Sequence, residues 1–193
     1  MPNSQEIQRI VIGISGASGA AYGVRLLEKL NRRPEVETHL IVSRPAEKTL
    51  RQETGLLLND LKALATVWHP IEEIGATIAS GSFLTAGMIV APCSIHTLAA
   101  IAHGLASNLL IRAADVTLKE RRRLVLMVRE SPLHLGHLRS MTAAAELGAI
   151  IAPPMPDFYN RPSSVDEIVE QGAGRTLDLF GISDPETKRW SGA

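Results

Sequence analysis

Three stretches of this sequence combine small or polar residues in a pattern that suits anion binding. They are the turn Gly13–Gly19, the segment Cys93–Thr97 and the pair Arg129-Glu130, and each adjoins an apolar run. A small-residue turn that leads into a helix leaves backbone N–H groups without partners, and such groups attract anions. The pattern predicts a site for a phosphate-bearing ligand, although a tight turn without any ligand would use the same residues.

The glycine spacing narrows the class of ligand. It is Gly13-x-x-Gly16-x-x-Gly19, which differs from the G-x-G-x-x-G pattern of dinucleotide-binding domains. The next apolar run ends in Ser43-Arg44, where a dinucleotide enzyme would carry an Asp or Glu for the ribose hydroxyls. We therefore expect a mononucleotide, whose phosphate or ribityl chain contacts serine hydroxyls, and not NAD.

Basic residues further along the chain suggest a second phosphate site. Arg112 and Lys119 are seven positions apart, so in a helix they share one face. With Arg129 they could converge on a small phosphorylated substrate, to which each charge-assisted hydrogen bond would contribute roughly 1.5–3 kcal/mol. For Arg121–Arg123 we expect only solvated charges at the end of that helix.

The Cys93–Thr97 segment has both a structural and a functional interpretation. Ser94 and Thr97 could simply cap a helix, or they could provide a second contact for the anion or the ribityl chain. Cys93 could be a nucleophile, but a lone cysteine at a strand end is more typical of packing. His96 has no partner at metal-ligand spacing, so we expect no metal site.

For four other polar residues the sequence alone does not decide between roles. Glu53 reads as an exposed helix residue, and Glu130 could merely pair with a neighbour. Tyr159 lies in the proline-rich loop 153–162, which could be a lid or a subunit contact. Arg175 lies in the last helix beside two glycines, which are unusual in a helix interior.

The elements that must position these residues alternate between strands and helices. We expect strands at 10–14, 36–42, 87–91, 124–128 and 149–152, and helices at 20–30, 46–53, 59–65, 94–104, 108–121, 133–147 and 165–180. We expect Asn59 to cap the third helix, Ser164-x-x-Glu167 to form a capping box, and Pro92 to close the third strand. The segment 67–82 resists assignment. Strands that are apolar on both faces favour a parallel sheet covered on two sides.

The predicted fold is therefore α/β, a Rossmann- or flavodoxin-like three-layer sandwich with a mainly parallel sheet, formed by one domain over residues 1–193. Ligands of such folds bind beyond the carboxyl ends of the strands. This is the region where the polar stretches named above are expected.

The composition excludes several classes of partner. The chain has 193 residues, with 20 basic and 20 acidic side chains, so no global charge draws it to nucleic acid or a membrane surface. Aromatic residues make up only 4%, which indicates an aliphatic core. The single cysteine fits a reducing compartment, and Met1–Gln8 lacks the apolar core of a signal peptide. We expect a cytoplasmic protein, and the apolar content makes a homo-oligomer plausible.

Taken together, the motifs resemble those of the UbiX-type flavin prenyltransferases, in order and over nearly the whole chain. The matching segments are Ser15–Gly19, Ala91–Thr97, Arg112–Glu120, Arg129–Leu133, Pro153–Tyr159 and Arg189-Trp190. The segments Ser80–Phe83 and Tyr159-Asn160 look most like the branch encoded beside phenolic-acid decarboxylases.

The resemblance implies an enzyme that joins a dimethylallyl group from dimethylallyl phosphate to N5 and C6 of reduced FMN. The implied product, prenylated FMN, serves as cofactor for decarboxylases of the UbiD type. The resemblance also implies that no metal is required and that the chain forms a homododecamer with active sites at subunit junctions.

The resemblance assigns roles residue by residue. It places FMN against Gly16, Ala17, Ser18, Ser43, Ser94, Ile95, His96, Thr97 and Arg129. It assigns the prenyl phosphate to Arg112, Lys119, Tyr159 and Arg175, with Arg112 coming from the same subunit or from a neighbouring one. It gives catalytic roles to Ser18, Glu53, Glu130 and Lys119. Ile95-His96 replaces a common Met-Lys, and Pro45 replaces a commonly aromatic residue, so the preferred prenyl donor stays open.

Two other functions compete with this one. The first is a flavoprotein like the cysteine decarboxylases, which rely on a histidine base in the first strand–helix unit, but here Tyr22 and Val24 flank Gly23. The second is a non-catalytic FMN-binding accessory subunit of a decarboxylase. Such a carrier would not need the second set of cations.

Overall fold

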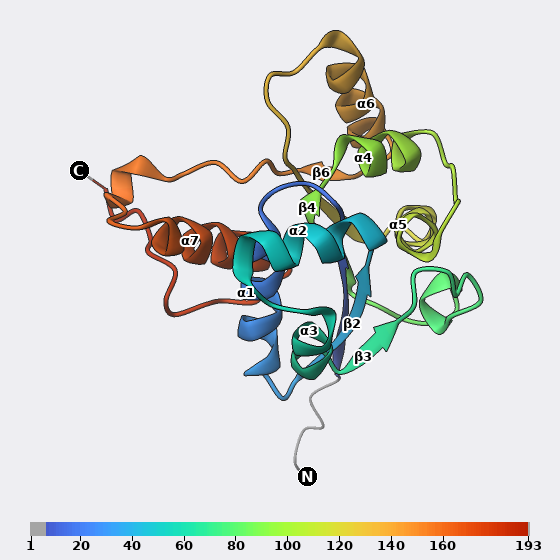
Figure 1. The fold of residues 1–193 in the computed structure, drawn as a ribbon, viewed down its shortest axis with the longest axis horizontal. Helices are drawn as coiled ribbons and strands as arrows, with labels where there is room; N and C mark the ends of the chain where they lie inside the picture. The colour runs from blue at the N-terminus through green and yellow to red at the C-terminus, as the bar shows by residue number, and fades with distance from the viewer. Residues whose placement is uncertain (1–6, 193) are drawn as a thin grey trace.

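The computed structural model describes residues 7–192, which form one parallel sheet with helices on both faces (Figure 1). The strand order is β3-β2-β1-β4-β5-β6, and every neighbouring pair is parallel. The strands are β1 (Gln8–Ile14), β2 (Val36–Val42), β3 (Val67–His69), β4 (Gly87–Cys93), β5 (Arg123–Val128) and β6 (Ile150–Ile151). The predicted three-layer α/β fold is confirmed. Residues 1–6, most of the segment that we judged unlike a signal peptide, lie outside the described part.

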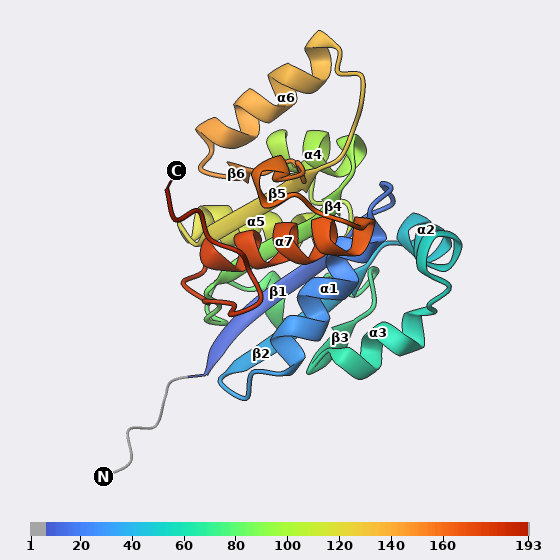
Figure 2. The ribbon, with the colours of Figure 1, turned by 90° about the vertical axis from the view of Figure 1, so that its left-hand side faces the viewer.

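Helices cover the sheet in two layers. The helices are α1 (Ala20–Asn31), α2 (Arg44–Thr54), α3 (Leu58–Leu64), α4 (Ile95–Ala102), α5 (Leu109–Lys119), α6 (Leu135–Glu146) and α7 (Val165–Asp178), with short 3₁₀ turns η1 (Thr77–Ala79) and η2 (Phe158–Asn160). Buried side chains of α1, α2, α3 and α7 share a core with one face of the sheet. Those of α4 and α5, with one residue of α6, share a core with the other face. Figure 2 shows α1 and α7 together on their side of the sheet. No helix of the described residues is long and apolar enough to cross a membrane.

The alternation of β1 explains how one strand serves both layers. Ile10, Ile12 and Ile14 are fully buried in the first core, whereas Val11 belongs to the second. Gly13 also faces the second layer, where a Cβ atom would lie 2.9 Å from Cε of Met88. Glycine at this position therefore lets the α5 layer approach the sheet closely.

Several expected boundaries need correction. Asn59 does not cap α3, because the cap residue is Leu57 and the Asp60 carboxylate accepts the Leu57 N–H at 2.8 Å. Pro92 does not close β4, which continues to Cys93 through a register shift. The unassigned segment 67–82 contains the edge strand β3 and the turn η1.

The expected capping box of α7 is also altered. Ser164 caps as predicted by accepting the Glu167 N–H, but the Glu167 carboxylate accepts the N–H and hydroxyl of Ser163 rather than the Ser164 N–H. The loop before α7 places Ser163, rather than Ser164, within hydrogen-bond distance of the Glu167 carboxylate.

A buried ammonium fastens the end of the chain to the first layer. Lys29 of α1 is almost fully buried, and its Nζ donates to Glu170 of α7 and, at 2.7 Å, to Asp184. Glu186 lies 3.3 Å from the same Nζ. These three acidic residues are the one group with metal-ligand proximity among the described residues. Because the Lys29 ammonium pairs with all of them, we interpret the group as an ion-pair network rather than a metal centre.

Replacing Lys29 tests this network. Lys29→Met should lower the free energy of unfolding by about 3 kcal/mol, because it leaves buried carboxylates without their partner. Lys48 of α2 is exposed, so Lys48→Met should change the free energy by no more than about 0.5 kcal/mol. Urea unfolding of both variants measures the difference, and equal small losses would contradict the role given to Lys29.

A second buried polar group lies in the second layer at the sheet edge. His39 of β2 and His69 of β3 are nearly fully buried, and their Nδ1 and Nε2 atoms are 2.9 Å apart. Glu37 Oε1 lies 2.8 Å from His39 Nε2. With both rings neutral, His39 Nε2 donates to the carboxylate and His39 Nδ1 accepts from His69 Nε2. Burial lowers the pKa of each histidine, more than the Glu37 charge raises that of His39.

The histidine pair predicts a pH dependence of stability. Because the folded-state pKa of each ring lies below its unfolded value, the unfolded chain binds protons first as the pH falls. The free energy of unfolding should therefore be highest above about pH 6.5 and decline below it. Denaturant titrations at several pH values check this, with the double variant His39→Leu/His69→Leu as reference. An equally steep decline in the double variant would show that other groups cause it.

Candidate active site at the carboxyl edge of the sheet

The polar stretches meet where the strand order changes direction. β1 lies between β2 and β4, so the chain leaves β1 toward one side of the sheet and later returns on the other. Such a switch point opens a crevice beyond the carboxyl ends of the two central strands. The turn Gly16–Ser18 follows β1 and the segment Ser94–Thr97 follows β4, so both border this crevice.

Hydrogen bonds between the strand ends fix this edge. The Ser15 hydroxyl donates to the Pro92 carbonyl at 2.8 Å and accepts the Ser94 N–H at 2.7 Å. The Ser43 N–H donates to the Ile14 carbonyl, and the Arg129 N–H donates to the Cys93 carbonyl. Four strand ends are thereby held in register with one another. Ser15 is itself buried, so its role is to position the neighbouring turns.

Glu53 occupies the N-terminus of α1. Its Oε2 accepts the N–H groups of Gly19 and Ala20, both at 2.9 Å. Although partial burial raises the pKa of Glu53, the Ser18 hydroxyl, these two N–H groups and the Arg129 charge together hold it below its usual value. The positive end of the α1 dipole is thus matched by a carboxylate of the protein, and not left for a ligand as the sequence suggested.

Other backbone donors at the crevice have no protein acceptor. Among the described residues, none accepts a hydrogen bond from the N–H groups of Gly16, Ala17 or Ser18. Ile95 and His96 begin α4, where helix geometry leaves the first N–H groups free. These two sets of donors suit a ligand with phosphate or hydroxyl oxygens.

The serines of this edge act as helix caps. Ser43 accepts the Ala46 N–H and so caps α2, and Ser94 accepts the Thr97 N–H and donates to the Thr97 hydroxyl. The structural interpretation is therefore confirmed for Ser94, whereas Thr97 lies in the first turn and supplies the capped N–H. A ligand contact by the same hydroxyls stays a prediction. Gly16 packs against the start of α2, since a Cβ atom there would lie 2.5 Å from Cβ of Pro45.

Arg129 and Glu130 extend from the end of β5. Both side chains are exposed, and Arg129 makes no ion pair with any described residue. Glu130 accepts the Ser131 N–H at 3.1 Å and does not pair with Arg129. A guanidinium and a carboxylate are therefore both available to a ligand at this edge.

Burial decides the role of Cys93. Its side chain is fully buried, and burial raises the pKa of the thiol far above its usual range. The thiol stays protonated and inaccessible, so the packing interpretation of Cys93 is the one that the structure supports.

Tyr159 and Arg175 each contact residues distant in sequence. Arg175 lines a surface pocket with Met127 and the Pro153-Pro154 segment, and it pairs with Asp178. The Tyr159 ring, in η2, packs edge-on against Trp190 with centroids 5.4 Å apart. We did not expect the C-terminal segment to contact Tyr159. The match of Arg189-Trp190 to the family was the one signal that drew attention to that segment.

Lys119 lies elsewhere, and Arg112 is two turns before it on the same helix. α5 leads into the start of β5, so Lys119 at its end lies by the amino edge of the sheet, whereas Arg129 follows the carboxyl end of β5. The strand between them spans roughly 20 Å. The expectation that these three cations converge is therefore wrong within one chain. A spacing of seven residues places two side chains on one helix face, but it does not determine at which edge of the sheet the helix ends. Arg112 pairs with Asp115 at 2.8 Å.

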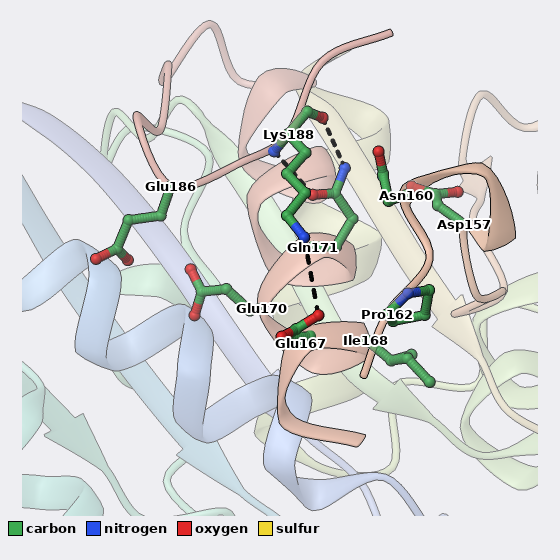
Figure 3. Close-up of a pocket in the computed structure, with 9 residues that line it drawn as sticks. All are labelled: Asp157, Asn160, Pro162, Glu167, Ile168, Glu170, Gln171, Glu186 and Lys188. Carbon is green, nitrogen blue, oxygen red and sulfur yellow. Dashed lines mark hydrogen bonds and ion pairs between the residues drawn. The ribbon is translucent and has the colours of Figure 1, made fainter. Parts of the chain in front are cut away.

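A separate pocket of about 180 Å³ lies on the outer side of α7 (Figure 3). Its lining includes Glu167, Glu170 and Lys188, and the Gln171 amide exchanges two hydrogen bonds with the Lys188 backbone, both at 2.9 Å. These contacts fasten the C-terminal segment to α7. None of the predicted site residues lines this pocket.

Known proteins share the sequence and fold. A family model described as Flavoprotein matches residues 1–174. The flavin prenyltransferase UbiX of Escherichia coli (strain K12) is 56% identical over 189 residues, which cover 97% of this chain and 100% of that protein. A crystal structure of a dodecameric FMN-dependent UbiX-like decarboxylase from Escherichia coli O157:H7 superposes with a TM-score of 0.94 at 49% identity, covering 96% of this chain and 100% of that one. The structure of AnUbiX in complex with FMN and dimethylallyl pyrophosphate gives a TM-score of 0.94 at 47% identity, covering 96% and 98%.

The Glu53 cap can be tested separately from any reaction. Glu53→Ala should lower the free energy of unfolding at neutral pH by about 1 kcal/mol, because two N–H groups lose their acceptor. The neighbouring Gln52→Ala, on the exposed side of the same helix, serves as control. Since the folded-state pKa of Glu53 is lowered, the difference should vanish as the pH falls through that pKa. Equal urea midpoints for the two variants at neutral pH would refute the cap.

Proposed function

The chain belongs to the UbiX-type flavin prenyltransferases within the Flavoprotein family, and from that premise we propose how its residues divide the work of the reaction. The enzyme is a flavin prenyltransferase. The reaction that we propose transfers a dimethylallyl group from dimethylallyl phosphate to N5 and C6 of reduced FMN. The observation that carries the proposal is the array of free donors, hydroxyls and one unpaired guanidinium around the switch point of the sheet.

The donors at the switch point would hold FMN. Gly16, Ala17 and Ser18 offer N–H groups on one side of the crevice, and the residues of α4's first turn offer them on the other. The hydroxyls of Ser43 and Ser94 and the Arg129 side chain complete the set. Reduced FMN supplies the electron-rich ring that accepts the prenyl group.

The cations would act on the leaving phosphate. Arg129 follows the carboxyl end of β5, and together with Arg175 and the Tyr159 hydroxyl it would bind the prenyl phosphate beside the flavin. Fixed cations stabilise the negative charge that builds up on a departing phosphate more than they stabilise the bound substrate, so they lower the barrier.

Arg112 and Lys119 would join this site from a neighbouring subunit. Within one chain Lys119 lies by the opposite edge of the sheet, so it can serve the same phosphate only across an interface. Arg112 lies two turns earlier in α5, and we assign it to the same interface. The dodecameric assembly described for the Escherichia coli O157:H7 relative gives a precedent for a homododecamer. Exposed leucines on α6, among them Leu135 at 59% and Leu138 at 46%, offer apolar surface for subunit contacts.

Proton movement would be the task of the carboxylates. Closing a ring at C6 releases a proton, and an exposed carboxylate without a strong partner can accept it. Glu130 meets that description better than Glu53, whose lowered pKa and two backbone hydrogen bonds make it a weak base. We therefore assign proton transfer to Glu130, with Glu53 as a fixed charge that orients Ser18.

The product would pass to a UbiD-type decarboxylase. This step rests on the family's place in flavin maturation. The donor set of the crevice consists of N–H, hydroxyl and guanidinium groups, so the proposal requires no metal.

A mass measurement tests the reaction. Enzyme incubated anaerobically with reduced FMN and dimethylallyl phosphate should yield a flavin heavier by one prenyl unit, and parallel samples with dimethylallyl pyrophosphate identify the preferred donor. Unmodified FMN in both, with the flavin kept reduced, would refute the proposed reaction. Decarboxylation of an aromatic acid by the enzyme alone would instead indicate a different activity.

A variant of Glu130 tests the assignment of the base. Glu130→Gln should lower the rate of product formation by roughly 100-fold, the usual contribution of a positioned acid or base, while FMN binding is retained. Glu146→Gln, an exposed glutamate at the end of α6, serves as control. An unchanged rate in Glu130→Gln would reassign the proton transfer.

A further inference from the structure

The loop Ser80–Phe83 packs against the end of α5 so closely that a side chain on Gly81 would displace two side chains of that helix end. A Cβ atom on Gly81 would fall inside the van der Waals radius of Glu120 Oε1 and would lie 2.8 Å from Lys119 Nζ. The backbone of Gly81 therefore packs directly against the side chains of Glu120 and Lys119. Its φ is not in the left-handed region, so an alanine there would act only by moving these two side chains.

Arg122 holds this loop in place. Its guanidinium donates to the carbonyls of Gly81 at 2.6 Å and Phe83 at 2.8 Å. Arg121, the residue before it, has a positive φ of 56°, which turns the chain back after α5 and directs Arg122 toward the loop. The loop and the helix end are thus one unit, although 38 positions separate Gly81 from Lys119 in sequence.

Glu120 pairs with Lys119 directly above Gly81. Lys119 Nζ donates to Glu120 Oε1, and both side chains remain accessible, at 46% and 33%. The Lys119 ammonium is the first cause of a lowered pKa at Glu120, so the carboxylate is ionised at neutral pH. A lysine side chain with four rotatable bonds is in this way confined to one region.

We propose that Gly81 and Glu120 are positioning residues that present the Lys119 ammonium to the phosphate of the prenyl donor. The inference rests on the proposed role of Lys119 in binding that phosphate. An ammonium has three donors, and pairing with Glu120 uses one of them, which leaves two for phosphate oxygens. Ordering the side chain before the substrate arrives reduces the entropy lost on binding.

Gly81→Ala on the full-length oligomeric enzyme is the first test. The added methyl group must displace Glu120 and Lys119, so KM for dimethylallyl phosphate should rise roughly tenfold, the loss of one charge-assisted hydrogen bond, with FMN affinity unchanged. Gly75→Ala is the matched control, because a Cβ atom there meets nothing within 4 Å. Equal KM values for the two variants would overturn the proposal.

A double-mutant cycle separates positioning from general damage to the loop. Glu120→Ala alone should raise KM by roughly threefold, because Lys119 loses its partner. Adding Gly81→Ala to Glu120→Ala should cost much less than it does in the wild type, because the clash is gone and the two effects are coupled. Additive effects would mean that Gly81 acts through loop folding and would overturn the proposal. If Gly81→Ala does not fold, the KM of Glu120→Ala alone tests the proposal, and an unchanged KM would overturn it.

Lys119→Ala distinguishes failure of the inference from failure of the proposed function. If Lys119→Ala leaves KM for the prenyl phosphate unchanged, the role of Lys119 itself is wrong, and the positioning inference falls with it. If Lys119→Ala raises KM but Gly81→Ala behaves as Gly75→Ala does, only the positioning inference is wrong.

Discussion

The common direction of the strands is the constraint on which the rest of the structure depends. All six strands are parallel, so their carboxyl ends lie along one edge and their amino ends along the other. The turns after β1 and β4 and the end of β5 therefore share an edge without being near in sequence. The Ser15 hydroxyl then joins two of these ends by bonding both Pro92 and Ser94. Because α5 leads into the start of the parallel strand β5, the end of α5, with Lys119, lies by the opposite edge.

The fold was largely predictable, because most of its elements have local signals in the sequence. Apolar runs such as 36–42 match β2 residue for residue, and the small-residue turns mark the crevice. Elements whose signals depend on tertiary contacts were missed. β3 has only three residues and is stabilised by pairing with β2, and the cap of α3 comes from Asp60 reaching back rather than from Asn59.

Placement of charged groups was predicted less well, because spacing in one helix carries no information about other elements. Arg112, Lys119 and Arg129 looked convergent, yet the topology separates them. Glu53 looked like a surface residue, yet it caps α1 from another helix. Both discrepancies concern contacts between residues distant in sequence. An oligomer like the dodecamer of the Escherichia coli O157:H7 relative would bring the two edges of different subunits together, as we propose for this chain.

The central claim is that one active site uses both edges of the sheet, taken from different chains. Hybrid oligomers test it most directly: chains with Lys119→Ala and chains with Arg129→Ala are co-expressed with different tags and purified through both. Each variant alone should be nearly inactive. Random pairing should restore about a quarter of the wild-type prenylation rate per site, because some junctions combine an intact Lys119 with an intact Arg129. Hybrids as inactive as the parents would contradict the claim, because both residues would then have to come from one chain.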